Sequence, residues 1–143
     1  MKTLYKLKDY KDTLRFEREH PKELRWDDKY KLYMLTEHPQ VQGFWIKDKD
    51  QLMAELIVTW QSESVVHGDS ITVLPEFRRQ GLATKLVDDM LVWADNMGFE
   101  YFTGEARFGS SWKMFENMGA SPLFNHKNWN NTGEDYMFFK MDV

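Results

Sequence analysis

Cysteine is absent from the 143 residues of the chain. Without it the protein has no disulfide, no thiolate nucleophile and no cysteine-based zinc or iron-sulfur site. A composition free of cysteine fits a reducing compartment, so we expect a cytoplasmic protein.

Long apolar runs are also missing from the beginning of the sequence. Residues 1–10 read MKTLYKLKDY, in which lysines separate the leucines and tyrosines. A secretory signal needs about 7 to 15 consecutive apolar residues, and a membrane-spanning helix needs about 20. We therefore expect neither export nor a membrane partner.

Positive charge is not in excess. The formal net charge is -4 at pH 7, and the arginines and aromatic residues form no basic stripe. A field of this sign does not attract phosphate backbones or anionic membranes, so a nucleic acid is not expected as a partner. A cationic acceptor is compatible with it.

What the sequence does contain is enough apolar material for one core. Hydrophobic residues make up 42% of the chain and aromatic residues 15%, with only 8 glycines and 4 prolines. We see no repeat, no low-complexity tract and no linker rich in proline and glycine. Residues 1–143 are therefore read as a single domain, a size that one core can fill.

Apolar periodicity predicts strands and helices in a definite order. A short strand over residues 3–8 precedes two helices near 10–19 and 27–37. Beyond Pro39, residues rich in β-branched and aromatic side chains predict strands over 41–46, 52–60 and 65–74, and a charged turn separates the first two. These three strands should pair antiparallel.

The clearest helix is expected over residues 79–97, where apolar residues recur every three or four positions and Gly98 follows as a C-cap. A strand over 99–106, a short helix over 110–118 and a closing strand over 136–141 come next. A helix between two strands makes those strands parallel. The expected fold is therefore mixed α/β, with a mainly antiparallel sheet, one parallel crossover and helices on both faces.

A motif for anion binding lies where the third of these strands leads into the long helix. Gly81 stands at the start of the helix, where free backbone N–H groups and the helix dipole favour negative charge. Thr84 adds a hydroxyl, and Arg78 and Arg79 add positive charge. On its own, a glycine at a helix start more often serves a turn, and two arginines are usually solvated.

The same segment resembles the GNAT N-acetyltransferase family. Arg78-x-x-Gly81-x-Ala83 is similar to that family's Gln/Arg-x-x-Gly-x-Gly/Ala motif, and Val73-Leu74-Pro75 to the Val-x-Pro before it. The order of elements also resembles the family over nearly the whole chain. The resemblance implies that acetyl-coenzyme A (acetyl-CoA) binds here, with its diphosphate on the loop amides and its pantetheine and acyl carbonyl on the strand backbone near Val73 and Leu74. The implied cofactor-binding set is Val73, Leu74, Arg78, Arg79, Gln80, Gly81, Leu82, Ala83 and Thr84.

A second family feature is matched only in part by Phe115-Glu116-Asn117-Met118-Gly119. The family often has tyrosine where this chain has Phe115, and asparagine and alanine where it has Phe108 and Ser111. Helical spacing also fits Phe115 as a packed core aromatic. Without a phenol, the departing thiolate would take its proton from water, from Ser111 or from the amine.

The general base is left open between three side chains and water. His67 and Asp69 lie on one face of the strand that precedes the motif, because alternate strand residues share a face. The pKa of a free imidazole is about 6.5, which suits neutral pH. Glu105 on the following strand and a chain of waters are the alternatives, and a lone histidine in such a position is more often a surface residue.

The remaining histidines, His20, His38 and His126, show no spacing typical of metal ligands, so no metal site is expected. Residues 124–135 are long for a hairpin connection and contain Trp129 and four asparagines. Loops of this length are often functional. This one could contact the acceptor or a second copy in a homodimer, or be flexible surface.

The function expected from the resemblance is transfer of an acetyl group from acetyl-CoA to a primary amine, by direct attack in a ternary complex. The acceptor could be a protein lysine, a protein N-terminus or a small amine of the polyamine kind. Because Phe115 removes the usual acid, a second function stays open. It is a catalytically inactive acyl-CoA-binding or protein-interaction module on the same fold.

Overall fold

A computed structural model of the chain describes residues 2–4, 40–49, 51–131 and 133–143. The helices predicted near 10–19 and 27–37, and most of the first predicted strand, lie outside the described residues. The contacts divide the chain into two compact units. The first unit comprises Met1–Trp60 and Asp69–Met90, and the second comprises Gln61–Gly68 and Leu91–Val143.

The strands of the first unit follow the order β1–β2–β3–β4. β1 (Lys2–Leu4) pairs antiparallel with β2 (Val41–Asp48), which forms a hairpin with β3 (Gln51–Trp60). The end of β4 (Val65–Val73) completes the unit, and its pairing continues where the Leu74 amide donates to the Met53 carbonyl at 3.1 Å. The predicted hairpin and third strand are thus confirmed.

Close packing between β2 and β3 explains one glycine and one buried charge. Trp45 and Glu55 are direct cross-strand partners, and the indole Nε1–H donates to the carboxylate Oε2 at 3.0 Å. Both side chains are fully buried. A Cβ on Gly43 would overlap the Trp45 ring. Only glycine therefore lets this ring lie flat along its own strand.

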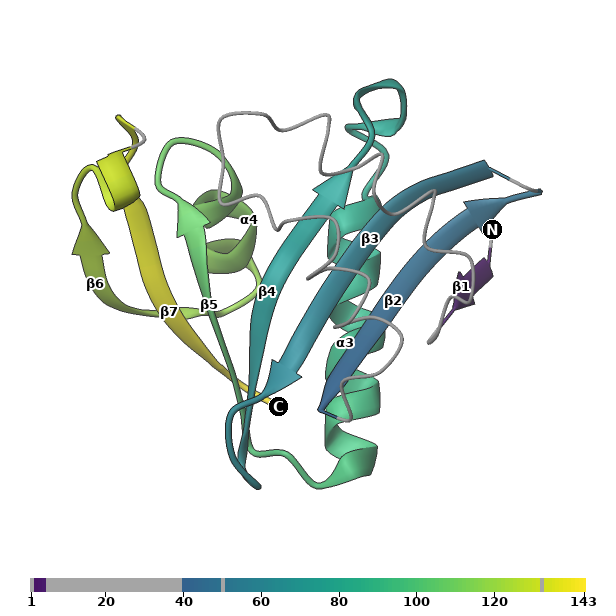
Figure 1. Cartoon of the computed structure of the whole chain (residues 1–143), viewed down its shortest axis with the longest axis horizontal. Coiled ribbons are helices and arrows are strands. Elements are labelled where there is room, and N and C mark those ends of the chain that lie inside the picture. The colour runs from purple at the N-terminus through teal and green to yellow at the C-terminus, as the bar shows by residue number, and fades with distance from the viewer. Residues whose placement is uncertain (1, 5–39, 50, 132) are drawn as a thin grey trace. The chain divides into compact units, whose positions relative to one another are not determined.

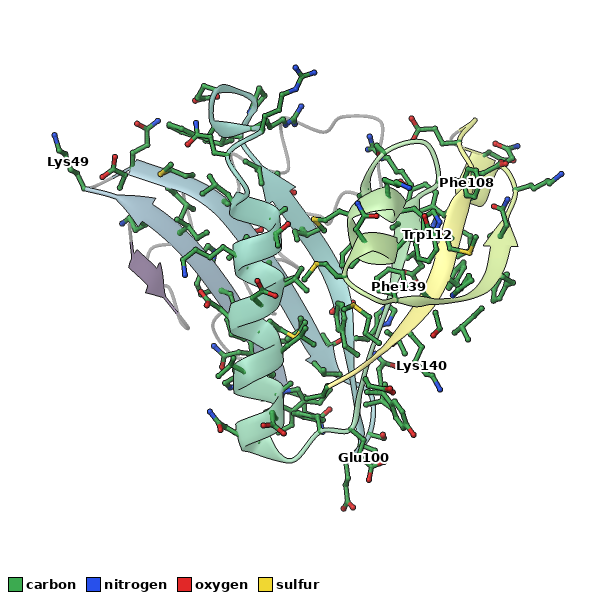
Figure 2. The ribbon with its side chains drawn as sticks, turned by 180° about the vertical axis from the view of Figure 1, so that it is seen from behind. Lys49, Glu100, Phe108, Trp112, Phe139 and Lys140 are labelled. Carbon is green, nitrogen blue, oxygen red and sulfur yellow. The ribbon has the colours of Figure 1, made fainter. Side chains whose placement is uncertain are left out.

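The long helix α3 (Leu82–Met97) begins three residues later than predicted, because the turn before it extends through Gly81. Its first intrahelical bond runs from the Lys85 amide to the Gly81 carbonyl at 3.0 Å. It ends at Gly98, whose φ of 89° is the left-handed conformation expected of a C-cap glycine. Residues 82–90 of α3 belong to the first unit, and their ribbon runs along one face of that unit's strands (Figures 1 and 2).

The apolar stripe predicted on α3 is largely buried, although its end is not. Leu82, Leu86 and Val87 are at most 2% exposed, whereas Met97 in the last turn is 51% exposed. A stripe with a spacing of three and four drifts around the helix, so its last members need not face the same neighbours as the first.

The strands of the second unit follow the order β4–β5–β7–β6. The beginning of β4 pairs parallel with β5 (Tyr101–Arg107), which confirms the predicted crossover. β5 pairs antiparallel with β7 (Tyr136–Asp142), and β7 with β6 (Ser121–His126). The expected mixed α/β fold is therefore confirmed.

The helix α4 (Ser111–Asn117) covers one face of the second unit and lies beside β5 (Figure 1). Phe115 stacks on Phe139 with ring centroids 4.4 Å apart. Trp112 meets the same ring with centroids 5.9 Å apart, and Figure 2 labels these two residues. A Cβ on Gly104 would lie 2.9 Å from the Phe139 ring, so this glycine makes room for it. The alternating burial of β5 directs its odd-numbered residues, Tyr101 to Arg107, to the other face.

One strand was not recognised in the residue pattern. Residues 124–126 were predicted to begin a long loop, but they end β6. The prediction was wrong because β6 lies at the end of the strand order and nearly all its side chains are exposed, so it lacks the alternation that marks a half-buried strand. The connection to β7 is shorter than predicted, and a single 3-10 turn, η2 (Trp129–Asn131), forms within it.

Candidate active site

In the first unit, the segment between β4 and α3 makes two sharp changes of direction. A 3-10 turn, η1 (Pro75–Phe77), follows β4, and Pro75 opens it where a missing backbone N–H costs nothing. Arg79 then has a φ of 62° and Gly81 a φ of 76°. A left-handed conformation suits glycine but costs an arginine about 1 kcal/mol or more, so this loop holds backbone strain.

The start of α3 offers a backbone site for an anion. The amides of Leu82, Ala83 and Thr84 precede the first intrahelical bond and therefore have no helical acceptor of their own. The helix dipole places partial positive charge at the same point. Apart from its neighbours in the chain, nothing lies within 4 Å of a Cβ built on Gly81, so the space beside this residue is open. This geometry suits an anion, and the binding of the coenzyme A diphosphate here stays a prediction.

The two arginines before this helix differ in what the structure shows of them. Both side chains are exposed. Arg78 Nε donates to the Val73 carbonyl at 3.0 Å, so Arg78 braces the end of β4 against the loop. A guanidinium has five N–H donors, and the other four leave Arg78 able to meet a phosphate as well.

The backbone at the end of β4 offers two candidate amides for a contact with an acyl carbonyl. The Leu74 amide already donates to the Met53 carbonyl, which leaves the Val73 amide as the better candidate.

In the second unit, two of the three predicted base candidates come together. His67 on β4 lies opposite Thr103 on β5, and its Nδ1 is 2.8 Å from the Thr103 hydroxyl. Its Nε2 is 3.4 Å from Oε1 of Glu105, with the two side chains 20% and 23% exposed. A hydroxyl can donate or accept, so the Thr103 contact suits either neutral tautomer of His67, whereas the Glu105 carboxylate only accepts. The two contacts together hold the imidazole in orientation.

The other two predicted catalytic residues are Asp69 and Ser111. Asp69 is half-buried on β4, two residues after His67. Ser111 opens α4 and is half-buried. Phe115 is 3% exposed between Phe102 and Phe139, which confirms that it is a packed core aromatic. Its ring has no proton to give.

Sequence reasoning missed two contributors to this face of the second unit. Thr103 was not singled out, although it stands two residues before Glu105 and therefore shares its face of the strand. The second contributor is a group of rings from β6, η2 and β7: Phe124, His126, Trp129 and Phe138. The alternation of residues 136–141 could have placed Phe138 on the same face as Glu105. Phe124 and His126 could not be placed in this way, because β6 has no alternating pattern.

Within the described ranges, no group of three or more histidine, cysteine, aspartate or glutamate side chains is arranged to hold a metal ion. The same part of the chain contains no helix that is both long and apolar enough to cross a bilayer.

Comparison with known proteins decides the family. Residues 6–120 match the model of the acetyltransferase (GNAT) family. The chain belongs to this family. The match includes the helix-start motif, His67 and Glu105. No curated protein matches the chain in sequence.

Solved structures share the fold of this GNAT chain at low sequence identity. The ribosomal-protein-S18-alanine N-acetyltransferase of Escherichia coli is 16% identical with a TM-score of 0.85, covering 99% of this chain and 93% of that one. Ard1 of Thermoplasma volcanium is 14% identical with a TM-score of 0.80, covering 100% and 99%. A GNAT acetyltransferase of Elizabethkingia anophelis with acetyl-CoA bound is 14% identical with a TM-score of 0.77, covering 99% and 97%.

Proposed function

We propose that the protein is an N-acetyltransferase that transfers the acetyl group of acetyl-CoA to a primary amine. The observation that carries the proposal is the His67–Glu105 pair, whose Nε2 and Oε1 atoms are 3.4 Å apart. His67 lies on the strand before the family's cofactor motif and Glu105 on the strand after it, and the pair is the candidate base. Two of the similar solved proteins are described as an N-acetyltransferase and as an acetyl-CoA complex, which agrees with this reaction class.

The start of α3 would hold the cofactor. Its amides and dipole suit the diphosphate, Thr84 offers a hydroxyl, and the exposed Arg79 offers positive charge. Acetyl-CoA, when bound, supplies the acyl group as an activated thioester. The chain's own task at this end is therefore to bind and orient.

Acceptor activation would fall to His67 and Glu105. The amine must lose a proton as its nitrogen bonds to the acyl carbon and the carbon–sulfur bond breaks. Either the Glu105 carboxylate takes this proton directly, or it orients His67 to take it. The departing thiolate then regains a proton from water or from Ser111, because the buried Phe115 offers none.

Phe115 also favours a second candidate, an acyl-CoA-binding module that has lost catalysis. It stands in the position where the family often carries its acid, and it is packed into the core rather than turned toward solvent. This candidate predicts binding of acetyl-CoA without turnover.

The two candidates separate in one experiment. The protein is incubated with acetyl-CoA labelled in the acetyl group and a panel of amines, namely a lysine peptide, peptides with free N-termini, and small amines. The proposal expects label in an amine and an equal amount of free thiol. Cofactor binding by calorimetry without labelled product from any amine would instead support the binding module.

A further inference from the structure

The face of the second unit turned away from α4 carries a group of rings that we call the aromatic platform, made of Phe124, His126, Trp129 and Phe138. Phe124 and Phe138 stack with centroids 4.5 Å apart and planes 12° apart. Trp129 meets Phe138 edge-on at 5.3 Å, and His126 meets Trp129 at 4.4 Å. Rings from two strands and the intervening turn thus form one contiguous surface.

This platform begins directly beside the candidate base. Phe138 on β7 is the cross-strand partner of Glu105 on β5. Direct partners point to the same face, with Cβ atoms about 4.5 to 5.5 Å apart. Glu105 in turn contacts His67. The His67–Glu105 pair and the aromatic platform are therefore neighbours on one surface of the second unit.

The turn that presents Trp129 is held by hydrogen bonds before any ligand arrives. The Trp129 amide donates to the Glu134 carbonyl at 2.9 Å, and the Gly133 amide donates to Asn128 Oδ1 at 2.7 Å. The Asn128 amide donates to Asp135 Oδ1 at 2.9 Å. A surface that is already ordered binds without a further entropic cost for its own arrangement. These bonds hold the described residues of the turn around Trp129 in place.

Water still reaches the outer end of the platform. Phe124 is 55% exposed even though it stacks on Phe138. An apolar or aromatic group laid against the stacked Phe138 and Phe124 rings would remove apolar surface from water and add a favourable ring contact. At the inner end, the Glu105 carboxylate attracts a cation. The surface is therefore complementary to a molecule with an ammonium at one end and a ring at the other.

We propose that the aromatic platform binds the body of the acceptor, and that the acceptor is a primary amine with an aromatic ring two carbons from its nitrogen. The inference rests on the proposed function and names its substrate class. With the nitrogen at Glu105, a two-carbon link places the acceptor's ring at Phe138, the direct cross-strand partner, and Phe124 supports this position by stacking on Phe138. Small arylalkylamines and peptides that begin with phenylalanine share this chemistry.

The test compares kcat/KM for phenethylamine with kcat/KM for n-butylamine, which lacks the ring. We expect the ratio to be about tenfold or more, the size of effect that one aromatic contact with its burial produces. Phe124→Ala should lower the ratio toward one. The control Leu123→Ala removes a side chain that is 56% exposed on the same strand, and it should leave the ratio unchanged. Dipeptide amides beginning with Phe or Ala show whether a peptide N-terminus is taken in the same way.

Calorimetric binding of the same two amines, in the presence of coenzyme A, separates this inference from the proposed function. Preference for phenethylamine that Phe124→Ala abolishes supports the platform whether or not acetyl is transferred. Equal turnover of both amines by the wild type leaves the proposed function standing and overturns the platform. A ratio that falls equally in Leu123→Ala and Phe124→Ala also overturns it, because the effect would then belong to the strand rather than to the ring.

Discussion

The two candidate sites are built from different materials. At the start of α3 in the first unit, the recognition groups are backbone amides, and Gly81 contributes by having no side chain. On β4 and β5 in the second unit, the site consists of the side chains of His67, Thr103 and Glu105, and the backbone only sets their register. A backbone site should therefore be sensitive to an added Cβ, and a side-chain site to the loss of a single functional group.

The largest effect is expected from Gly81→Val. Valine there would be forced into a φ of 76°, and its branched side chain would occupy the open space directly before the first amides of α3. We expect the affinity for coenzyme A to fall about a hundredfold or more, which corresponds to about 2.7 kcal/mol. Calorimetric titration with coenzyme A measures this loss.

Gly98→Val is the matched control. Gly98 follows the other end of the same helix, has a φ of 89° and also has nothing within 4 Å of a built Cβ. Both substitutions should cost similar stability, because both force a branched residue into a left-handed conformation. Equal losses of affinity in the two variants would show that strain, rather than the blocked amides, causes the effect.

The next effect concerns the side-chain site. Glu105→Gln and His67→Ala should each lower kcat about a hundredfold, the lower end of what a general base contributes. If the two act as one unit, the double variant should lose little more than either single variant. Steady-state rates at saturating acetyl-CoA measure this. Losses that multiply would contradict a joint role for the pair.

Proton handling in the wild type gives a related expectation. Without a phenol at Phe115, the rate at saturating amine should rise with pH to a plateau, because only deprotonation of the amine and its base limits it. A bell-shaped profile whose alkaline limb survives both Glu105→Gln and Ser111→Ala would identify another proton donor.

Much of the fold could be predicted from short stretches of sequence. The two sites differ in this respect, because one is formed by neighbouring residues and the other by residues far apart in the sequence. The helix-start motif could be predicted because its ligands are backbone groups, and a short stretch around Gly81 specifies their geometry. The His67–Glu105 contact could not be predicted, because it depends on the register between β4 and β5, and those strands are far apart in sequence. Both residues were candidates, but nothing local joined them. The β6 strand was missed for a similar reason, since an exposed edge strand imposes no apolar alternation.

A smaller effect is expected from Phe115→Tyr. The ring is 3% exposed and stacks on Phe139, so an added hydroxyl would be buried against apolar neighbours. A buried hydroxyl without a partner costs about 1 to 3 kcal/mol of stability, while kcat should change little. Thermal unfolding and steady-state rates measure the two. An increase in kcat with no loss of stability would mean that the hydroxyl reaches the reacting groups.

The smallest effect is expected from Arg79→Gly. The left-handed φ of 62° at Arg79 suits glycine, so the variant should relieve strain of about 1 kcal/mol, less the entropy that glycine adds to the unfolded chain. Affinity for coenzyme A should fall modestly, because the substitution removes an exposed charge and leaves the amides in place. Arg79→Ala loses the same charge without the relief, so the difference in unfolding free energy between the two variants isolates the strain.

The central claim is that the start of α3 binds acetyl-CoA and that Glu105 serves the chemical step. It is tested most directly by the steady-state kinetics of acetyl transfer at varied acetyl-CoA concentration, for the wild type, Gly81→Val and Glu105→Gln. We predict that Gly81→Val raises the KM for acetyl-CoA far more than it lowers kcat, and that Glu105→Gln lowers kcat and leaves that KM close to the wild-type value. The reverse pattern, or wild-type kinetics in both variants, would contradict the account.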